Sequence, residues 1–317
     1  MKAVTRRAYG TPEILAISEI DMPKIKDDEV LVRVRAVTVN RTDCGILTGK
    51  PYIIRAFVGP IRPAMVPGTD FAGEVRAVGR KVSRYKVGDR VFGFYDEGFK
   101  SQAQYMAISV KKAIVHIPDG VSFQEAVAST EGFHYANNFI NKIASSKKKV
   151  LVNGATGAIG SAALQILKHM GCYVTAVGNT KNLELLGNLG ADKVIDYEKE
   201  DFTRDTEQYD IILDAVGKSS FKKCKPLLGP SGIYLSSELG PYAQNTYLPL
   251  LTLFQGKRVV FPLPTNCKRS ILYAQDLLSK GLFKPVIDRV YPMEEIREAY
   301  KYVLTGQKTG NVVIAIP

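Results

Sequence analysis

The chain has 317 residues, a net charge of +12, 45% hydrophobic residues and 23% charged residues. This length exceeds what one hydrophobic core usually holds, so two domains are expected. No apolar run reaches the roughly 18 residues that a membrane span needs, and the first residues lack the apolar segment of a signal peptide. We therefore expect a cytoplasmic protein.

The positive charge raises the question of nucleic-acid binding. Lys and Arg are interleaved with Asp and Glu, and no RNA-binding or helix-turn-helix signature accompanies them. A generally basic surface, or a groove for anionic phosphates, explains the charge more simply. The four cysteines lie far apart without a Cys-x-x-Cys pair, which argues against a structural zinc lobe and a disulfide framework.

The first part of the chain reads as β-rich. Residues 29–40 alternate apolar and polar positions as a half-buried strand does, and 71–79 and 88–94 are further short strands. Residues 122–145 are predicted to be helical, with Ser122 as N-cap and Glu125 completing a capping box.

Strands and helices then alternate, and the short apolar runs indicate a parallel sheet buried on both faces. The predicted strands are 149–154, 173–178, 193–197, 209–217 and 232–237, with helices at 160–171, 182–190 and 221–230. The last part returns to a mixed pattern, with helices at 270–281 and 293–306 and a strand at 310–317. The expected fold class is α/β, with a doubly wound parallel-sheet domain (123–261) inserted between two segments of a β-rich domain (1–122 and 262–317).

A glycine-rich loop joins the strand at 149–154 to the helix that follows. Glycines there let the backbone turn tightly and approach a pyrophosphate, which then sits at the helix N-terminus. Read as G-x-G-x-x-G, the loop has Ala155 in the place of the first glycine, and no Gly-Lys-Ser/Thr follows that would make it a P-loop. A purely structural turn remains open. The predicted cofactor contacts of this loop are Gly154, Ala155, Thr156, Gly157, Ala158 and Ile159.

The next strand ends without the Asp or Glu that would hold the ribose hydroxyls of NAD. Asn179, Thr180 and Lys181 offer hydrogen-bond donors and a positive charge, which suit a 2′-phosphate and favour NADPH. The alternative for Lys181 is a solvated loop lysine. Tyr197 is a candidate to stack on the adenine or to donate to the same phosphate, and equally an ordinary surface tyrosine.

The stretches "AVTVNRTDCGILTGK", "VPGTDFAGEVRAVG", "YKVGDRVFGF", "GATGAIGSAALQ", "LGADKVIDY", "YDIILDAVG" and "KTGNVVIAIP" carry a resemblance over nearly the whole length. The chain resembles the medium-chain dehydrogenase/reductase superfamily, in its zinc-free quinone oxidoreductase-like (zeta-crystallin-like) branch. The resemblance implies a GroES-like catalytic domain around an inserted Rossmann domain, with the active site in the cleft between them, and backbone at Gly217 beside the nicotinamide.

The same resemblance bears on metal. The positions that hold catalytic zinc in related alcohol dehydrogenases read Asn40, Thr69 and approximately Val127, and none of these is a plausible zinc ligand. The sequence therefore predicts no metal site. Asp70, next to Thr69, is expected to be structural, with an arginine as a possible partner.

Without a Lewis acid the oxidation of an unactivated alcohol is difficult, whereas hydride transfer to a quinone or an α,β-unsaturated carbonyl needs less help. Asn40 is predicted to hydrogen-bond a carbonyl oxygen or the cofactor, and Thr42 matches a proton-relaying Ser/Thr of zinc enzymes. Tyr52 is a third catalytic candidate, with packing as its alternative. The roles of Glu131 and His134 are left open.

The leading hypothesis is an NADPH-dependent reductase of a small-molecule quinone or enone. The alternatives are a zinc-free enoyl-thioester or alcohol/aldehyde reductase of the same family, and a non-catalytic structural or RNA-binding homologue. Residues 258–261 are predicted to lie at an exposed sheet edge, and such edges invite pairing, so a homodimer is expected.

Overall fold

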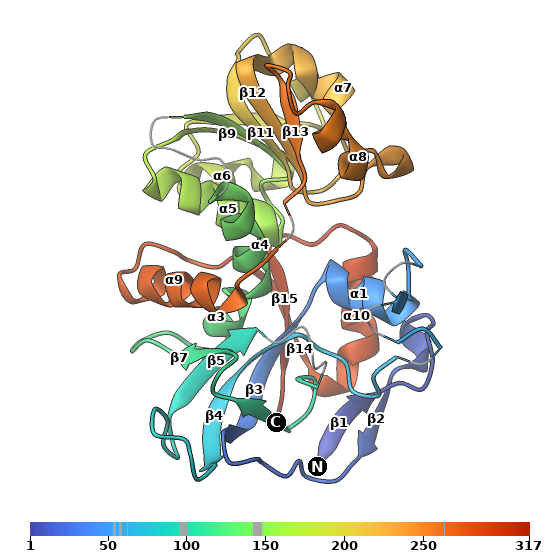
Figure 1. Cartoon of the computed structure of the whole chain (residues 1–317), viewed down its shortest axis with the longest axis vertical. Helices are drawn as coiled ribbons and strands as arrows, with labels where there is room; N and C mark the ends of the chain where they lie inside the picture. Colours follow the sequence, from blue (N-terminus) through green and yellow to red (C-terminus); the bar gives the residue numbers. More distant parts are fainter. Residues whose placement is uncertain (53–54, 57–58, 62, 95–99, 142–147, 263) are drawn as a thin grey trace. The chain divides into compact units, whose positions relative to one another are not determined.

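The computed structural model describes residues 1–52, 55–56, 59–61, 63–94, 100–141, 148–262 and 264–317. The chain divides into two compact units (Figure 1). Unit 1 comprises Met1–Glu131 and Cys267–Pro317, and unit 2 comprises Gly132–Asn266. Each unit has its own sheet, and unit 2 lies between the two segments of unit 1 along the chain.

Unit 1 is built on a mainly antiparallel sheet in the order β14-β15-β3-β4-β5-β7, with β6 paired to β3 and a separate β1–β2 pair. Its strands are β1 (Lys2–Thr5), β2 (Ala16–Glu19), β3 (Glu29–Val39), β4 (Asp70–Val78), β5 (Arg90–Phe94), β6 (Tyr105–Ser109), β7 (Ala113–His116), β14 (Ile287–Pro292) and β15 (Asn311–Ala315). Its helices include α1 (Arg41–Thr48), α3 (Phe123–Ala128), α9 (Cys267–Ser279) and α10 (Ile296–Leu304).

Strand β3 is the centre of this sheet. Val30, Val32 and Val34 are buried and alternate with half-buried residues, which confirms the predicted period of two. From Ala36 to Val39 every residue is buried, because β15 pairs along this part of the strand and helices cover it. The end of β3 therefore places Asn40, the residue that follows it, in a buried position.

Among the described residues, the helix predicted over 122–145 is broken into α3 and α4 (Glu131–Ile140), and residues 142–145 lie outside the described part of the chain. Ser122 and Glu125 form the expected capping box at the start of α3. The helical hydrogen bonding is interrupted at Ser129 and Thr130, which close against Ala126 and Val127 instead. Helix α3 packs on β3, β4 and β15, so it belongs to unit 1 and not to the inserted domain.

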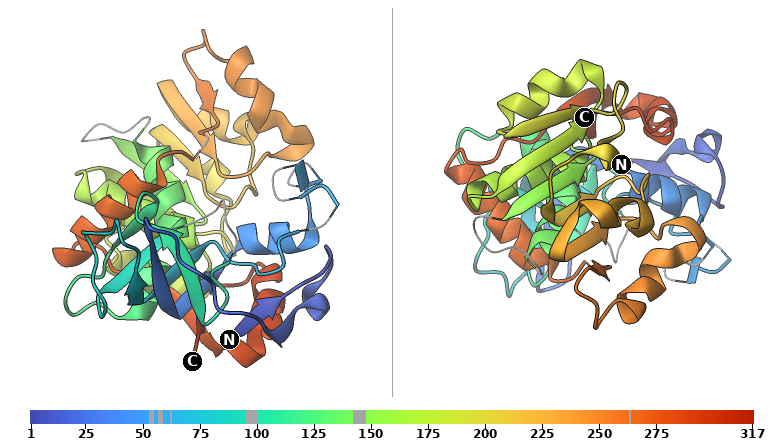
Figure 2. Two further views of the ribbon diagram at one scale, coloured as in Figure 1. Left: turned by 60° about the horizontal axis from the view of Figure 1, so that its bottom comes forward. Right: turned by 90° about the horizontal axis from the view of Figure 1, so that it is seen from above.

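Unit 2 is a parallel sheet in the order β10-β9-β8-β11-β12-β13, seen with its strands side by side in Figure 2. Counted from β8, this is the 3-2-1-4-5-6 order of dinucleotide-binding folds. The strands are β8 (Lys149–Asn153), β9 (Tyr173–Gly178), β10 (Lys193–Asp196), β11 (Tyr209–Asp214), β12 (Leu228–Ser236) and β13 (Arg258–Val260). The helices include α5 (Ala158–His169), α6 (Leu183–Asn188), α7 (Phe221–Cys224) and α8 (Gln244–Leu251).

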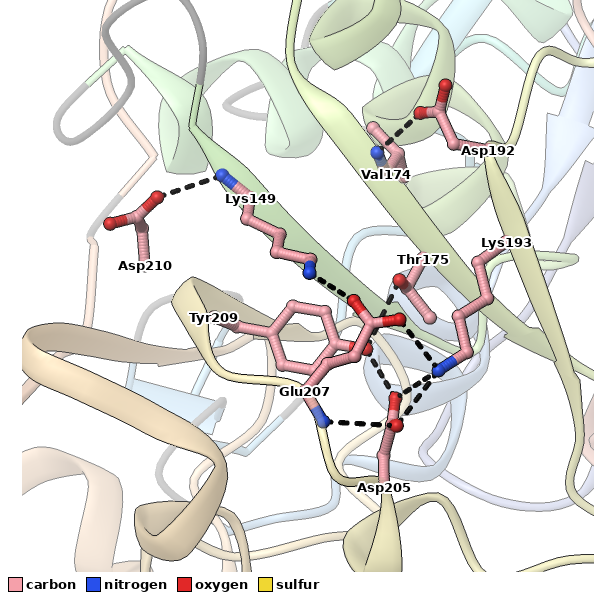
Figure 3. A network of polar contacts seen from close by, with 9 residues as sticks. All are labelled: Lys149, Val174, Thr175, Asp192, Lys193, Asp205, Glu207, Tyr209 and Asp210. Atoms are coloured by element: carbon pink, nitrogen blue, oxygen red, sulfur yellow. Dashed lines mark hydrogen bonds and ion pairs between the residues drawn. The ribbon is translucent and has the colours of Figure 1, made fainter.

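The amino ends of the parallel strands are tied together by a charged network (Figure 3). Lys193 Nζ donates to Asp205 at 2.8 Å and to Glu207 at 3.1 Å, and Lys149 pairs with Glu207. The buried Tyr209 hydroxyl joins Asp205 to Thr175. Because ligands of such folds bind at the carboxyl ends of the strands, this network at the opposite edge serves the stability of the sheet.

Candidate functional site

The glycine loop follows β8 at the carboxyl edge of the parallel sheet. Gly154 has a left-handed φ of +76°, and a Cβ there would meet Val216 at 2.3 Å. A Cβ on Gly160 would lie 2.2 Å from the carbonyl oxygen of Gly154. Both positions thus require glycine, because the first turn of α5 packs directly on the loop.

Gly157 is different. It is the N-cap of α5, and a Cβ there would meet only the Gly154 oxygen at 3.6 Å, an ordinary contact. The space in front of Gly157 is open, so the backbone N–H groups at the start of α5 are accessible to an anion. The loop residues Gly154 to Ile159 therefore fit the pyrophosphate of a dinucleotide.

The end of β9 carries the residues predicted to select the cofactor. Lys181 is exposed in a short turn, and Asn179 accepts a hydrogen bond from Asn182 at 2.6 Å. The Thr180 hydroxyl donates to Asp196 at 2.6 Å, and the Thr180 N–H donates to Glu198 at 3.0 Å.

These two acids correct the expectation that no carboxylate lies here. Asp196 ends β10 and Glu198 follows it two residues later, so sequence reasoning that looked only after β9 missed them. Thr180 is already engaged by both. Tyr197, which lies between them, is half exposed on the same edge of the sheet.

The loop after β11 is fixed by a buried carboxylate. Asp214 accepts hydrogen bonds from the N–H groups of Gly217 at 3.0 Å and Ser219 at 2.9 Å, and from the side chains of Asn153 and Tyr234. Gly217 has a φ of +66°, and a Cβ there would overlap Glu238. The backbone at Gly217 is thus held at the same carboxyl edge as the glycine loop.

Unit 1 contains a second polar cluster, at the end of β3 and the start of β4. Asp70 is fully buried and accepts hydrogen bonds from the Thr38 N–H at 2.8 Å, the Thr38 hydroxyl at 2.5 Å and the Thr130 hydroxyl at 2.9 Å. Burial raises the pKa of Asp70 to about 6, against the lowering effect of these donors. The expected arginine partner is not found among the described residues, and the structural role of Asp70 rests on hydroxyl and amide donors.

Asn40 lies between two residues of this region: Thr38, which donates to Asp70, and a second acid, Glu131. Its side-chain nitrogen donates to Thr38 Oγ1 at 2.7 Å and lies 3.4 Å from Glu131 Oε2. The Thr69 hydroxyl donates to the same Glu131 oxygen at 3.1 Å, and the nearby Thr42 hydroxyl acts to lower the pKa of this carboxyl group. Burial, together with the nearby Asp70, raises the pKa of Glu131 to about 7.

Asp43 is the third member of the carboxyl cluster, which we define as Asp43, Asp70 and Glu131. Lys308 is a cation beside this cluster. Asp43 accepts the Asn40 N–H at 2.8 Å and so fixes the first turn of α1; burial and the Glu131 charge raise its pKa. Lys308 is partly exposed, and desolvation lowers its pKa to about 8 in spite of the neighbouring Glu131. Neither Lys308 nor the role of Glu131 was identified from the sequence, because their proximity depends on the fold.

The predicted catalytic residues do not all meet. Asn40 and Thr42 share Glu131 as a partner. Tyr52 is 69% exposed, and its described contact is the Arg55 guanidinium, 5.0 Å from the ring centroid. Of the two residues left open, Glu131 joins the site in unit 1, whereas His134 belongs to unit 2, where its ring accepts from Asn138 at 3.2 Å.

In the described part of the chain, no group of three or more His, Cys, Asp and Glu side chains is arranged to hold a metal ion. At the positions where the resemblance expects zinc ligands, the Asn40 and Thr69 side chains instead donate to one carboxyl group.

In the same described residues, no helix is long and apolar enough to cross a membrane.

The fold, the glycine loop of unit 2 and the carboxyl cluster of unit 1 define a class of protein. In this class a dinucleotide-binding unit is inserted into a β-rich unit that has a polar site of its own. Residues 26–133 match the alcohol dehydrogenase GroES-like domain, and residues 189–314 match the zinc-binding dehydrogenase family. The chain is 33% identical to 2-methylene-furan-3-one reductase of Solanum lycopersicum, over 99% of this chain and 79% of that protein. It is 30% identical to an NADPH-dependent alkenal/one oxidoreductase, chloroplastic, of Arabidopsis thaliana, with the same shares covered.

The structure of the quinone oxidoreductase from Coxiella burnetii superposes with a TM-score of 0.89 at 23% identity, covering 100% of this chain and 99% of that one. This likeness shows the fold. The chain belongs to the medium-chain dehydrogenase/reductase superfamily, among its quinone oxidoreductases and alkenal reductases. The predicted family and fold class are confirmed.

Proposed function

We propose that the protein is an NADPH-dependent reductase that delivers hydride to an α,β-unsaturated carbonyl or a quinone without a metal ion. The observation that carries this proposal is the use of Asn40 and Thr69 as hydrogen-bond donors to Glu131. A cluster of donors and carboxyl groups is suited to hold an electrophilic carbonyl and to manage a proton. Among the relatives that are 30% or more identical, two have names that describe enone chemistry, and a third is named a zinc-type alcohol dehydrogenase-like protein. Quinones share the electrophilic character of enones.

In this proposal the reduced nicotinamide supplies the hydride. The loop residues Gly154 to Ile159 hold the pyrophosphate, and the Gly217 backbone lies beside the nicotinamide. Thr42 orients the substrate carbonyl and donates a hydrogen bond to the oxyanion that develops on it. Asn40 directs its two side-chain N–H groups to Thr38 and Glu131, which leaves its side-chain oxygen for the cofactor. Tyr52 is retained as a third candidate that lines the substrate site from its exposed position.

The choice of NADPH rests on Lys181, whose exposed ammonium group is free to approach a 2′-phosphate. Glu198 opposes it, because a carboxylate at the Thr180 N–H repels a phosphate at the same edge. The name of the Arabidopsis relative specifies NADPH for that protein. We infer that Lys181, together with Asn179 and Tyr197, outweighs the acid.

We further propose that the protein forms a homodimer through unit 2. Strand β13 ends the parallel sheet, so one of its edges is unpaired among the described residues. Beside it, α8 and the turn after it expose the apolar residues Leu250, Leu251, Leu253 and Phe254, the last of them 97% exposed. An open strand edge next to an apolar patch is the arrangement that a second copy of the chain covers.

We propose a cytoplasmic location. The alternative is the chloroplast, because the name of the Arabidopsis relative describes that protein as chloroplastic. Imaging of a full-length fluorescent fusion in the source cells distinguishes the two.

The test of the function is NADPH oxidation by the purified protein with a p-quinone, a short enone and an enoyl-CoA, measured side by side. We expect turnover with the enone or the quinone above that with the enoyl-CoA, and less than one zinc per chain by elemental analysis. Tight NADPH binding without acceleration by any acceptor would refute the reductase proposal. Stoichiometric zinc whose removal abolishes turnover would refute its metal-free form.

A further inference from the structure

The carboxyl cluster of unit 1 places Asp43, Asp70 and Glu131 in one buried region, and the three acids have different partners. Asp70 is saturated by one backbone N–H and two hydroxyl groups. Asp43 caps the start of α1 through the Asn40 N–H. These two acids have structural duties, because their bonds fix β3 to β4 and orient α1.

Glu131 has no such duty to a backbone group among the described hydrogen bonds. Its hydrogen-bond partners are the side chains of Asn40 and Thr69, and the Thr42 hydroxyl lies close to it. Asn40 and Thr69 are buried, as are Thr38 and Thr130, the hydroxyl-bearing residues that donate to Asp70. Thr42 is half-buried, so it is the neighbour of Glu131 with the greatest exposure to solvent.

Charge balance indicates that Glu131 can hold a proton. Asp43 faces it from α1 and Asp70 from β4, and three buried carboxylates cannot all be ionised cheaply. The cations near the cluster are the buried Arg6, which acts on Asp43, and Lys308, on the segment before β15; the exposed Arg41 acts on Lys308. Burial raises the pKa of Glu131 to about 7, so its proton is exchangeable near neutral pH.

We propose that Glu131 stores the proton consumed in the reduction and passes it to the substrate oxygen through the hydroxyl of Thr42. This inference rests on the proposed function. The substrate gains a hydride on its electron-poor carbon, which a bound reduced nicotinamide would supply, and an electron pair moves to the carbonyl oxygen. That oxygen takes the Thr42 proton, Thr42 takes the Glu131 proton, and Glu131 is left as a carboxylate.

Lys308 assists as a positioning residue. Its ammonium group donates to the Gly310 carbonyl oxygen and lies near enough to Glu131 for each charge to stabilise the other. The carboxylate that remains after proton donation is thereby neutralised in part, and it regains a proton from water through the half-buried Thr42.

The test compares the wild type with Glu131→Gln. This substitution keeps the size of the side chain and removes the acidic proton of the carboxyl group. We expect kcat near neutral pH to fall about 100-fold, as for a lost general acid, with NADPH affinity within twofold of wild type. The pH profile of kcat should lose the limb near pH 7. The matched control is Glu294→Gln, an exposed glutamate in a different part of unit 1, which should leave kcat unchanged.

Thr42→Val tests proton transfer separately from proton storage, because it removes the Thr42 hydroxyl and keeps the Glu131 carboxyl group. Infrared spectroscopy of the protein without acceptor gives a readout that does not depend on turnover. Because burial also raises the pKa of Asp43 and Asp70, the readout is the spectrum of the protein minus that of Glu131→Gln. We expect this difference to contain a protonated-carboxyl band that titrates near pH 7, for the wild type and for Thr42→Val. A Thr42→Val enzyme with wild-type kcat, or a difference spectrum without this band, overturns the proposal.

The two hypotheses fail in different ways. If no acceptor accelerates NADPH oxidation by the wild type, the proposed function fails, and with it the use of the proton. If the wild type turns over and Glu131→Gln keeps its rate and pH profile, only the role of Glu131 fails.

Discussion

The side-chain nitrogen of Asn40 lies 3.4 Å from Oε2 of Glu131, a residue 91 positions further along the chain. Asn40 follows the last residue of β3, and Glu131 begins α4 after the break at Ser129 and Thr130. In a continuous helix from Ser122 onward, Glu131 would lie at a different position along the helix axis and on a different face of the helix. The break is held in place by the Thr130 hydroxyl on Asp70, so Asp70 positions Glu131 indirectly.

Protonation of Glu131 makes the stability of the protein depend on pH. Its pKa is about 7 in the folded protein and 4.5 in an unfolded chain, so the folded state binds more protons between these values. The contribution to the free energy of unfolding is complete below about pH 4.5 and is lost as the pH rises through about 7. In urea titrations the wild type should therefore lose stability relative to Glu131→Gln over this window. A difference between the two that stays constant with pH would contradict the raised pKa.

The glycine loop allows folding and cofactor binding to be separated. Gly160→Ala forces a Cβ to within 2.2 Å of the Gly154 oxygen, and we expect loss of several kcal/mol of stability together with NADPH affinity. Gly157→Ala should fold normally, because its φ of −75° suits alanine, and should lose NADPH affinity at least tenfold by filling the space of the pyrophosphate. Thermal melts and fluorescence titration measure the two effects.

The control for the loop is Gly187→Ala in α6, where a Cβ meets nothing within 4 Å. It should bind NADPH normally and gain about 0.4–1 kcal/mol of stability. Wild-type affinity in Gly157→Ala would remove the loop from the cofactor site.

Cofactor preference depends on the balance between Lys181 and Glu198. Lys181→Ala should lower the ratio of NADPH to NADH affinity about tenfold, because one charge-assisted contact to the phosphate is lost. Glu198→Gln should raise the same ratio, since it removes the opposing charge at the Thr180 N–H. Lys222→Ala, an exposed lysine on α7, serves as the control for net charge. Equal ratios in all three variants and the wild type would refute the assignment.

The exposed patch beside β13 predicts the oligomeric state. Light scattering should give the mass of two chains for the wild type. The double variant Leu250→Asp and Phe254→Asp should give the mass of one chain with unchanged far-ultraviolet dichroism, because both side chains are already exposed in the single chain. A monomeric wild type, or a double variant that remains dimeric, would show that this surface is not the interface.

The network at the amino ends of the sheet predicts a change in stability without a change in kinetics. Tyr209→Phe removes the buried hydroxyl that bonds Asp205 and Thr175, and the cost should be about 1–2 kcal/mol. Turnover and NADPH affinity at 25 °C should remain those of the wild type, because the carboxyl edge is untouched. A fall in affinity larger than threefold would contradict this division between the two edges.

Local patterns predicted most of the regular structure. The alternation in β3, the capping box at Ser122 and the apolar strands of unit 2 are short-range signals, and each matches an observed element. Helices α1 and α8 were not identified: α1 is short and includes Gly45, and α8 includes Pro249, so neither has a clear helical signal. Strands β1 and β2 are too short for their alternation to be distinctive.

What the amino-acid sequence determines by itself is the set of chemical groups and their local conformation. The glycine loop, Asn40 and Thr69 in place of zinc ligands, and the family can all be read along the chain. Tertiary structure alone decides which groups meet. Asp196 and Glu198 approach Thr180 because β10 pairs with β9, and Thr69, Asn40 and Lys308 gather around Glu131 because β3, β4 and the chain before β15 converge there. Electrostatic and hydrogen-bond energies act over a few ångströms of space, so the state of each acid depends on neighbours that sequence distance conceals.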